Sequence, residues 1–156
     1  FTQPVQPEQL LNRLAPLLPS GFALLEAHVV PVQAPALSQM LHSAHWRLSL
    51  QPSGGDGLPA EQRCQEALGE LLGAEALPLE DLDRQGRRRR RDLRPLLLDL
   101  HWHQWSPQRL ELGLETLVQA NGRSLKPDQL RQLLSQRLGC ELQQTQLRRV
   151  ALKLAC

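Results

Sequence analysis

Apolar and polar residues alternate most regularly in two neighbouring stretches of the chain. In residues 96–105, and again in residues 108–118, apolar side chains recur at nearly every second position. A period of two is typical of a strand that buries one face. A Ser-Pro pair at 106 and 107 separates the stretches and favours a turn. We therefore expect an antiparallel hairpin here.

The same period, in less regular form, predicts four further strands. They cover residues 22–30, 45–50, 77–82 and 142–154. Between them apolar residues recur at spacings of three and four, as in helices with one buried face. Proline suits the first turn of a helix, so we expect helices to begin after four prolines, Pro7, Pro35, Pro59 and Pro127.

The order of these elements predicts the fold class. Residues 45–82 and 108–154 each give strand, helix, strand, and the strand at 96–105 joins the two halves. We expect an α+β fold, in which an antiparallel sheet carries helices on one face in a ferredoxin-like layout. At this length, residues 1–156 should form a single domain.

Apolar runs are too short for a membrane span, which needs roughly 20 residues. The chain begins at Phe1 with neither Met nor a signal sequence, so we expect it to be part of a longer chain. Its three cysteines, Cys64, Cys140 and Cys156, lie far apart and form no C-x-x-C pair. That pattern favours reduced thiols in the cytoplasm.

The positive charge of the chain is concentrated in one segment. Eighteen basic and sixteen acidic residues give a net charge of +2, but residues 84–94 hold seven arginines and one acid, or +6. The rest of the chain has eleven basic and fifteen acidic residues, or −4. The arginines are Arg84, Arg87, Arg88, Arg89, Arg90, Arg91 and Arg94.

An extended arginine run cannot pack on an apolar core. Alternate side chains face opposite ways, so Arg87, Arg89 and Arg91 share one face while Arg88, Arg90 and Asp92 share the other. We expect a projecting hairpin that turns at Gln85-Gly86. Three interpretations stay open: a solvated edge that prevents aggregation, RNA binding through phosphates, or docking on an acidic protein surface.

Other kinds of site are weakly represented. His101 and His103 stand at i and i+2 on one predicted strand and are candidate metal ligands, but a zinc site needs further ligands, so we expect no metal. The serines lie in no G-x-S-x-G context, and the glycines at 54–57 lack the Lys-Ser/Thr pair of a phosphate loop. We expect no catalytic residue in this chain.

Several short sequence segments, taken in order along the chain, resemble those of one bacterial family. They lie at residues 18–22, 34–38, 122–128 and 147–149, and the most specific one is Asp92, Leu93, Arg94 and Pro95. Together they resemble the radical-SAM-linked domain of unknown function, found at the C-terminal end of bacterial B12-binding-type radical SAM proteins or encoded beside them. The five consecutive arginines depart from that family, where a mixture of Lys and Gly is usual.

The resemblance implies a partner. A radical SAM catalytic domain, in the same chain or a neighbour, would bring a 4Fe-4S cluster and S-adenosylmethionine, and the three-cysteine motif of such a cluster does not occur here. We expect a non-catalytic accessory domain that positions substrate, with RNA held by the arginine-rich hairpin. The alternative is a protein–protein docking domain for the catalytic module or an acidic partner.

Overall fold

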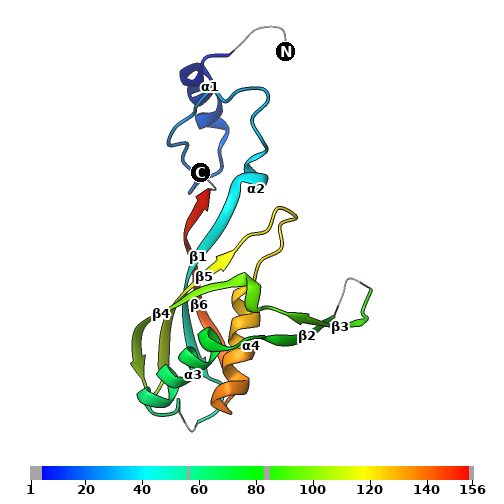
Figure 1. The fold of residues 1–156 in the computed structure, drawn as a ribbon. Helices are drawn as coiled ribbons and strands as arrows, with labels where there is room; N and C mark the ends of the chain where they lie inside the picture. The colour runs from blue at the N-terminus through cyan, green and yellow to red at the C-terminus, as the bar shows by residue number, and fades with distance from the viewer. Residues whose placement is uncertain (1–4, 56, 83–84, 155–156) are drawn as a thin grey trace. The chain divides into compact units, whose positions relative to one another are not determined.

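The computed structural model describes residues 5–55, 57–82 and 85–154. Its internal contacts separate the chain into two units, residues 1–35 and 36–156. The first contains helix α1 (Pro7–Leu14) and the 3₁₀ turn η1 (Ala15–Leu17), and the second begins with the short helix α2 (Leu37–Met40) (Figure 1). Whether residues 1–156 act as a single domain stays a prediction.

The strand expected at 22–30 does not form. This segment has no regular secondary structure, and its Leu25 and Val29 side chains are 90% and 78% exposed. Alternation makes a strand only where a neighbouring strand supplies backbone hydrogen bonds. No described residue pairs with residues 22–30 in a ladder, so this prediction was wrong.

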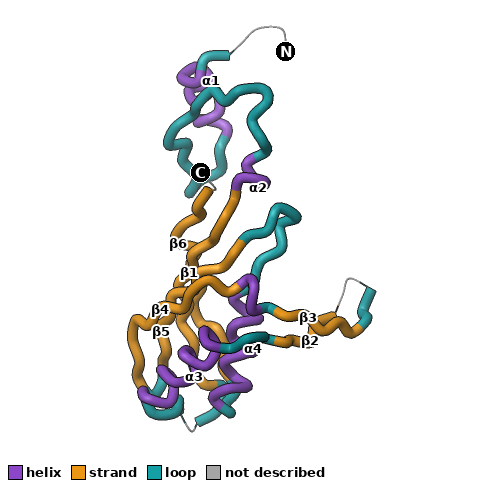
Figure 2. Tube along the Cα trace, in the orientation of Figure 1, coloured by secondary structure: helices purple, strands orange, loops and turns teal. Residues whose placement is uncertain are grey.

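The second unit is built on a four-stranded antiparallel sheet. Its strands are β1 (Leu41–Pro52), β4 (Leu97–Ser106), β5 (Arg109–Leu117) and β6 (Leu142–Leu154), in the order β4-β5-β1-β6 (Figure 2). Helix α3 (Glu61–Gly73) follows β1, and α4 (Pro127–Leu138) follows β5. This strand order and connectivity confirm the α+β class and the ferredoxin-like layout.

The first half of the layout differs from the prediction in one element. Strand β2 (Pro78–Leu82) forms as expected but does not enter the main sheet, and pairs instead with β3 (Arg88–Asp92) in a sheet of two strands. Strand β4 takes its place beside β5. Beyond Leu79 the sequence of β2 turns acidic, and such residues cannot line a leucine core without burying charge.

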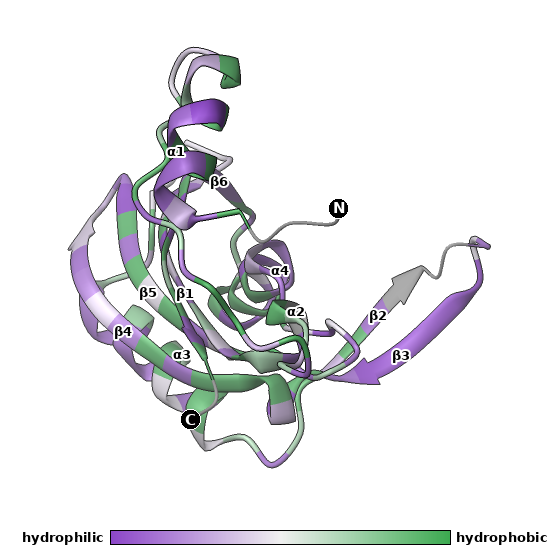
Figure 3. Ribbon diagram, turned by 90° about the horizontal axis from the view of Figure 1, so that it is seen from above, coloured by the Kyte–Doolittle hydropathy of each residue, from purple (hydrophilic) through white to green (hydrophobic). Residues whose placement is uncertain are grey.

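A core made almost entirely of leucine joins the sheet to the helices. Its fully buried members include Leu48, Leu50, Leu71, Leu110, Leu112, Leu114, Leu130 and Leu134. They come from one face of β1 and β5 and from the inner sides of α3 and α4, so both helices cover the same face of the sheet. Figure 3 shows the alternation along β4 and β5, where green apolar bands separate purple polar ones.

Local signals fix the limits of α4. Pro127 occupies the first turn, where its missing N–H needs no partner, and the side-chain oxygen of Gln129 accepts the N–H of Lys126 at 3.0 Å. Gly139 ends the helix with a φ of 67°, in the left-handed region that favours glycine.

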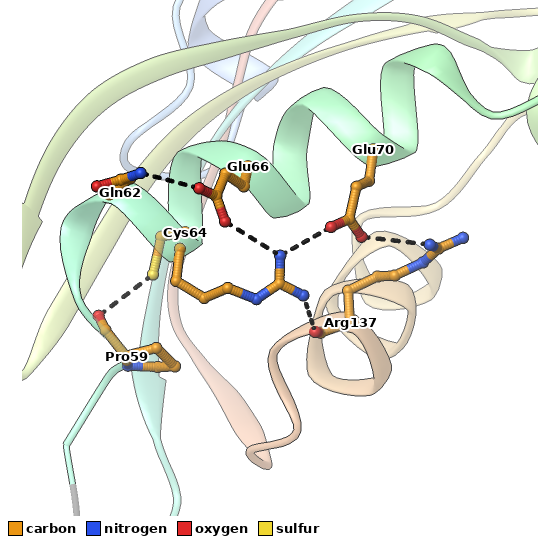
Figure 4. Close-up of polar contacts among 7 residues, drawn as sticks. Pro59, Gln62, Cys64, Glu66, Glu70 and Arg137 are labelled. Carbon is orange, nitrogen blue, oxygen red and sulfur yellow. Dashed lines mark hydrogen bonds and ion pairs between the residues drawn. The ribbon is translucent and has the colours of Figure 1, made fainter.

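A polar cluster links the outer sides of the two helices (Figure 4). Arg63 on α3 donates to Glu70 at 2.8 Å and to the Arg137 carbonyl of α4 at 2.7 Å, and Arg137 in turn contacts Glu70 at 3.3 Å. The hydrogen bond from Arg63 holds the pKa of Glu70 below its usual value. These contacts orient the helices, but they are exposed, and the apolar burial dominates the stability.

Within the described residues, no helix is both long enough and apolar enough to cross a membrane.

We expect Leu112→Ala on β5 or Leu133→Ala on α4 to lower the free energy of unfolding by about 2–5 kcal/mol, because each leaves a cavity in the leucine core. The two side chains are 0% and 5% exposed. Urea unfolding measures the change, and Leu152→Ala, at a site 43% exposed, is the control. A loss below about 0.5 kcal/mol at either core position would contradict this register.

Candidate functional site

The motif Asp92 to Pro95 closes the base of the β2–β3 ribbon, defined here as residues 78–92. One Asp92 carboxylate oxygen accepts the backbone N–H of Leu77 at 2.7 Å and that of Arg94 at 3.0 Å. The N–H groups of Arg94 and Leu77 hold the pKa of Asp92 below its usual value. Leu93 is buried and donates its N–H to the Leu77 carbonyl at 2.9 Å, so the ribbon is pinned to the core where it begins.

The Arg94 guanidinium joins three parts of the backbone. Its Nη2 donates to the Leu72 carbonyl and its Nη1 to the Leu97 carbonyl, both at 2.8 Å, while Nε donates to Ala74 at 2.9 Å. A cation at the C-terminal end of α3 also suits the helix dipole. Arg94 is therefore a structural residue that uses three of its five guanidinium N–H donors within the fold.

The acids of β2 offset part of the arginine charge. In the register of the ribbon, Glu80 lies opposite Arg90 and Asp81 opposite Arg89. Residues 78–94 contain seven arginines and four acids, so the segment carries +3 where the run alone gave +6. The sequence reasoning missed this because it counted charge along the chain and not across the ladder.

The arginines of the ribbon differ in exposure. Arg88, Arg89 and Arg90 are exposed, and Figure 1 shows their strand projecting from the main sheet as expected. Arg91 is half-buried beside the buried Leu79, its partner across the ladder, and its Nε is enclosed without a hydrogen bond. Arg87 is exposed just before β3, and Arg84 lies outside the described residues.

A second polar surface lies on the open face of the main sheet, which we define as the face opposite α3 and α4. Strand register places Arg148, Arg47, Gly113 and His101 in one row across β6, β1, β5 and β4. No motif in the sequence indicated this row, because its members come from four separate segments. In the sequence, these residues could be recognised only as positions that alternate with the apolar residues of their strands.

Gly113 is the centre of that row, and it leaves room for two imidazoles. A Cβ added to Gly113 would lie 3.0 Å from the His101 Cβ and 3.1 Å from the His103 Nε2. The pKa of His103 is lowered by burial first, then by the charges of Arg47 and His101, although Glu111 opposes the shift. The structure therefore brings His101 and His103 together over Gly113.

Ser43, His45 and Glu115 also meet on the open face, but not as a catalytic triad. Ser43 Oγ and His45 Nε2 lie 3.0 and 3.1 Å from the same Glu115 oxygen, and the serine is fully buried. In a triad the histidine would use two different nitrogens, and the hydroxyl would face substrate. Burial raises the pKa of Glu115, yet the Ser43 hydroxyl, the charge of His45 and Lys153 lower it overall.

The residues that the structure describes are not grouped in a way that fits a metal centre or an iron–sulfur cluster. Among the described residues, no three His, Cys, Asp or Glu side chains are grouped to hold a metal ion. Burial raises the pKa of the thiols of Cys64 and Cys140, which favours the protonated form, and Cys64 donates to the Pro59 carbonyl at 3.5 Å. Cluster ligands must be thiolates.

A family model described as an uncharacterized protein conserved in bacteria (DUF2344) matches residues 1–127. The chain belongs to this family. The residues matched by the DUF2344 family model include the ribbon and its base. The match ends at residue 127, where α4 begins. No curated protein sequence matches the chain.

Solved structures share the fold of this DUF2344 protein at low identity. A Cbf5-Nop10-Gar1 complex contains a chain that is 11% identical, with a TM-score of 0.57 over 74% of the present chain. An H/ACA RNP bound to a substrate RNA and an archaeal Nop10-Cbf5 complex each give a TM-score of 0.46, at 13% and 12% identity. The present chain covers 30–32% of those chains, and the first likeness indicates the fold alone.

We expect Arg94→Lys to lower the free energy of unfolding by about 1–3 kcal/mol, because an ammonium cannot reach three carbonyls held in this arrangement. Arg90→Lys on the exposed ribbon is the matched control, with a change within about 0.5 kcal/mol. Urea unfolding of the two variants compares them directly. Equal stability would show that the three Arg94 bonds are replaced by water without cost.

We expect Gly113→Ala to lower the free energy of unfolding by about 1 kcal/mol, because the new methyl meets the His101 Cβ, which cannot rotate away from it. Gly69→Ala on α3 is the control, since nothing lies within 4 Å of a Cβ there. In the middle of a helix, Gly→Ala should raise the free energy of unfolding by about 0.5–1 kcal/mol. A gain of similar size from both variants would contradict the packing of the imidazoles on Gly113.

Proposed function

We propose that this domain is a non-catalytic accessory domain of a bacterial radical SAM protein, and that it positions an RNA substrate through the β2–β3 ribbon. The observation that carries the proposal is the ribbon itself: three adjacent exposed arginines on a strand that projects from a rigid base. The cytoplasm is the compartment that this role requires.

The ribbon is suited to phosphates by its chemistry and by its anchoring. Guanidinium groups form two parallel hydrogen bonds to a phosphate, and an extended strand spaces them along a nucleic-acid backbone. The Asp92 and Arg94 contacts hold the base of the ribbon in place, so less conformational entropy is lost when the ribbon binds. A solvated edge would need none of these base contacts.

The size of the charge limits what the ribbon can do alone. The +3 of residues 78–94 supports weak, salt-sensitive binding with little sequence preference, since phosphate contacts carry no base information. Sequence or substrate choice would come from another surface or from the catalytic partner. In this arrangement the accessory domain binds phosphates without sequence preference, and substrate selection is made elsewhere.

The proposal of a radical SAM partner is based on the resemblance of several short sequence motifs, above all Asp92 to Pro95. The catalytic domain would supply the 4Fe-4S cluster and S-adenosylmethionine, for which the cysteines of this chain are unsuited. In this proposal the present residues hold the substrate, and no chemical step takes place on them.

Docking is the second candidate function, and the first unit favours it. Residues 5–35 expose large apolar side chains, among them Leu17, Phe22, Leu25, Val29, Val30 and Val32. Such residues stand exposed at a free energy cost that a protein surface would relieve. A catalytic module that protects Phe22 and Val32 from solvent on binding would establish this role.

We expect the chain to bind single-stranded RNA with a log affinity that falls with log salt at a slope of roughly −2, as for about three phosphate contacts. Arg88→Gln with Arg90→Gln removes two guanidinium groups from one face of the ribbon. The slope should then flatten by about 1.4, because each lost contact is worth about 0.7. Filter binding at several salt concentrations measures both values.

Arg13→Gln with Arg123→Gln is the control, because it removes the same charge from exposed arginines outside the ribbon. The control variant should keep most of the wild-type slope of log affinity against log salt. Neither double variant should shift the midpoint of urea unfolding appreciably, because exposed charges contribute little to stability. Equal RNA affinity of the ribbon variant and the wild type would show that the ribbon does not bind RNA. Docking would then be the remaining candidate function.

A further inference from the structure

Two arginines lie directly opposite each other on the open face, away from the ribbon. Arg47 on β1 and Arg148 on β6 are partners in the strand register, and both are exposed. The neighbouring Arg149 lies on the other face, over the Trp46 ring at 5.6 Å, which confirms that Arg148 points to the open side. Like charges at such a position oppose folding.

The acids nearest to this pair already have other partners. Glu111 contacts Arg109 at 2.7 Å, Glu115 contacts Lys153 at 3.4 Å, and Asp99 contacts His101 at 3.5 Å. In the part of the chain that the structure describes, neither Arg47 nor Arg148 forms an ion pair. Their charges are therefore left to solvent or to an external anion.

Next to Arg47 in the row, Gly113 has no side chain of its own and is covered by the imidazoles of His101 and His103. Because the central strand has no side chain there, Arg47 acts on His103 across β5, and the row from Arg148 to His101 crosses about 14 Å of sheet at roughly 4.8 Å per strand. Both imidazoles are exposed. The centre of the open face thus carries two guanidinium forks and two flat rings.

Protection of the sheet edge explains only part of this arrangement. Charged residues on an edge strand discourage pairing with other chains, and this would account for Arg148 on β6. Arg47, however, is on an inner strand, where a second arginine adds repulsion and no protection. The glycine is also two strands from the β6 edge.

We propose that the open face binds the phosphate of a nucleotide between Arg47 and Arg148, with the base against the rings of His101 and His103, which lie over Gly113. Guanidinium forks match phosphate oxygens in geometry, and histidine rings stack on bases in proteins that recognise single strands. The phosphate could belong to a free nucleotide or to an RNA strand. This site does not rest on the ribbon.

An NMR titration of the ¹⁵N-labelled chain tests the proposal with three probes: inorganic phosphate, uridine monophosphate and a uridine hexanucleotide. We expect the amide of Gly113 and those of Arg47 and Arg148 to shift. Arg47→Gln with Arg148→Gln should weaken binding about tenfold or more, the loss expected from removing charge-assisted hydrogen bonds. Arg148→Gln alone is the second variant, should the double variant lose its native spectrum.

The control variant Arg13→Gln with Arg123→Gln should bind all three probes as the wild type does, and the ribbon variant Arg88→Gln with Arg90→Gln should keep the Gly113 shift on titration with uridine monophosphate. A Gly113 shift that survives in the ribbon variant separates this site from the proposed function. Similar affinity for the monophosphate and the hexanucleotide identifies a free nucleotide as the source, and a preference for the hexanucleotide identifies RNA. Absence of shifts at Gly113 with all three probes, or equal binding by the Arg47/Arg148 variant and the control, would overturn the proposal.

Discussion

The Arg94 guanidinium joins the end of α3 to the start of β4, and the geometry of the ribbon depends on this contact. A strand pair inserted between a helix and the next sheet strand would move freely about its base without a fixed attachment. Three charge-assisted hydrogen bonds to carbonyls, together with the Asp92 carboxylate across the base, supply that attachment. Pro95 is the second residue of the 3₁₀ turn η2 (Arg94–Leu96), from which β4 enters the sheet.

The fold was largely predictable because the alternation of leucines and the positions of the prolines agree with each other. Residues 96–118 form the expected hairpin, and α4 follows Pro127 as expected. The errors have one physical origin. Alternation indicates that one face of a segment is apolar, but it does not say which strand will pair with it. Residues 22–30 therefore pair with no strand among the described residues, and β2 pairs with β3 outside the main sheet.

The candidate surfaces were less predictable than the fold, for a related reason. Charge counted along the chain overstated the ribbon, because Glu80 and Asp81 lie across the ladder from Arg90 and Arg89. The sequence did single out His101 and His103, yet their surroundings depend on Gly113 and Arg47 in other strands. Only a register can place residues 47, 101, 113 and 148 in one row.

The two arginine surfaces differ in what holds them in place, and this difference bears on their roles. The ribbon is pinned at its base, and Arg88, Arg89 and Arg90 are exposed on a strand that projects from the main sheet. Arg47 and Arg148 stand on paired strands of a sheet whose opposite face is closed by a leucine core, so their spacing is fixed before any ligand arrives. A preorganised site selects its ligand by shape, whereas a projecting charged strand mainly raises the chance of encounter. If both surfaces act on one RNA, capture would therefore fall to the ribbon and recognition to the open face of the sheet.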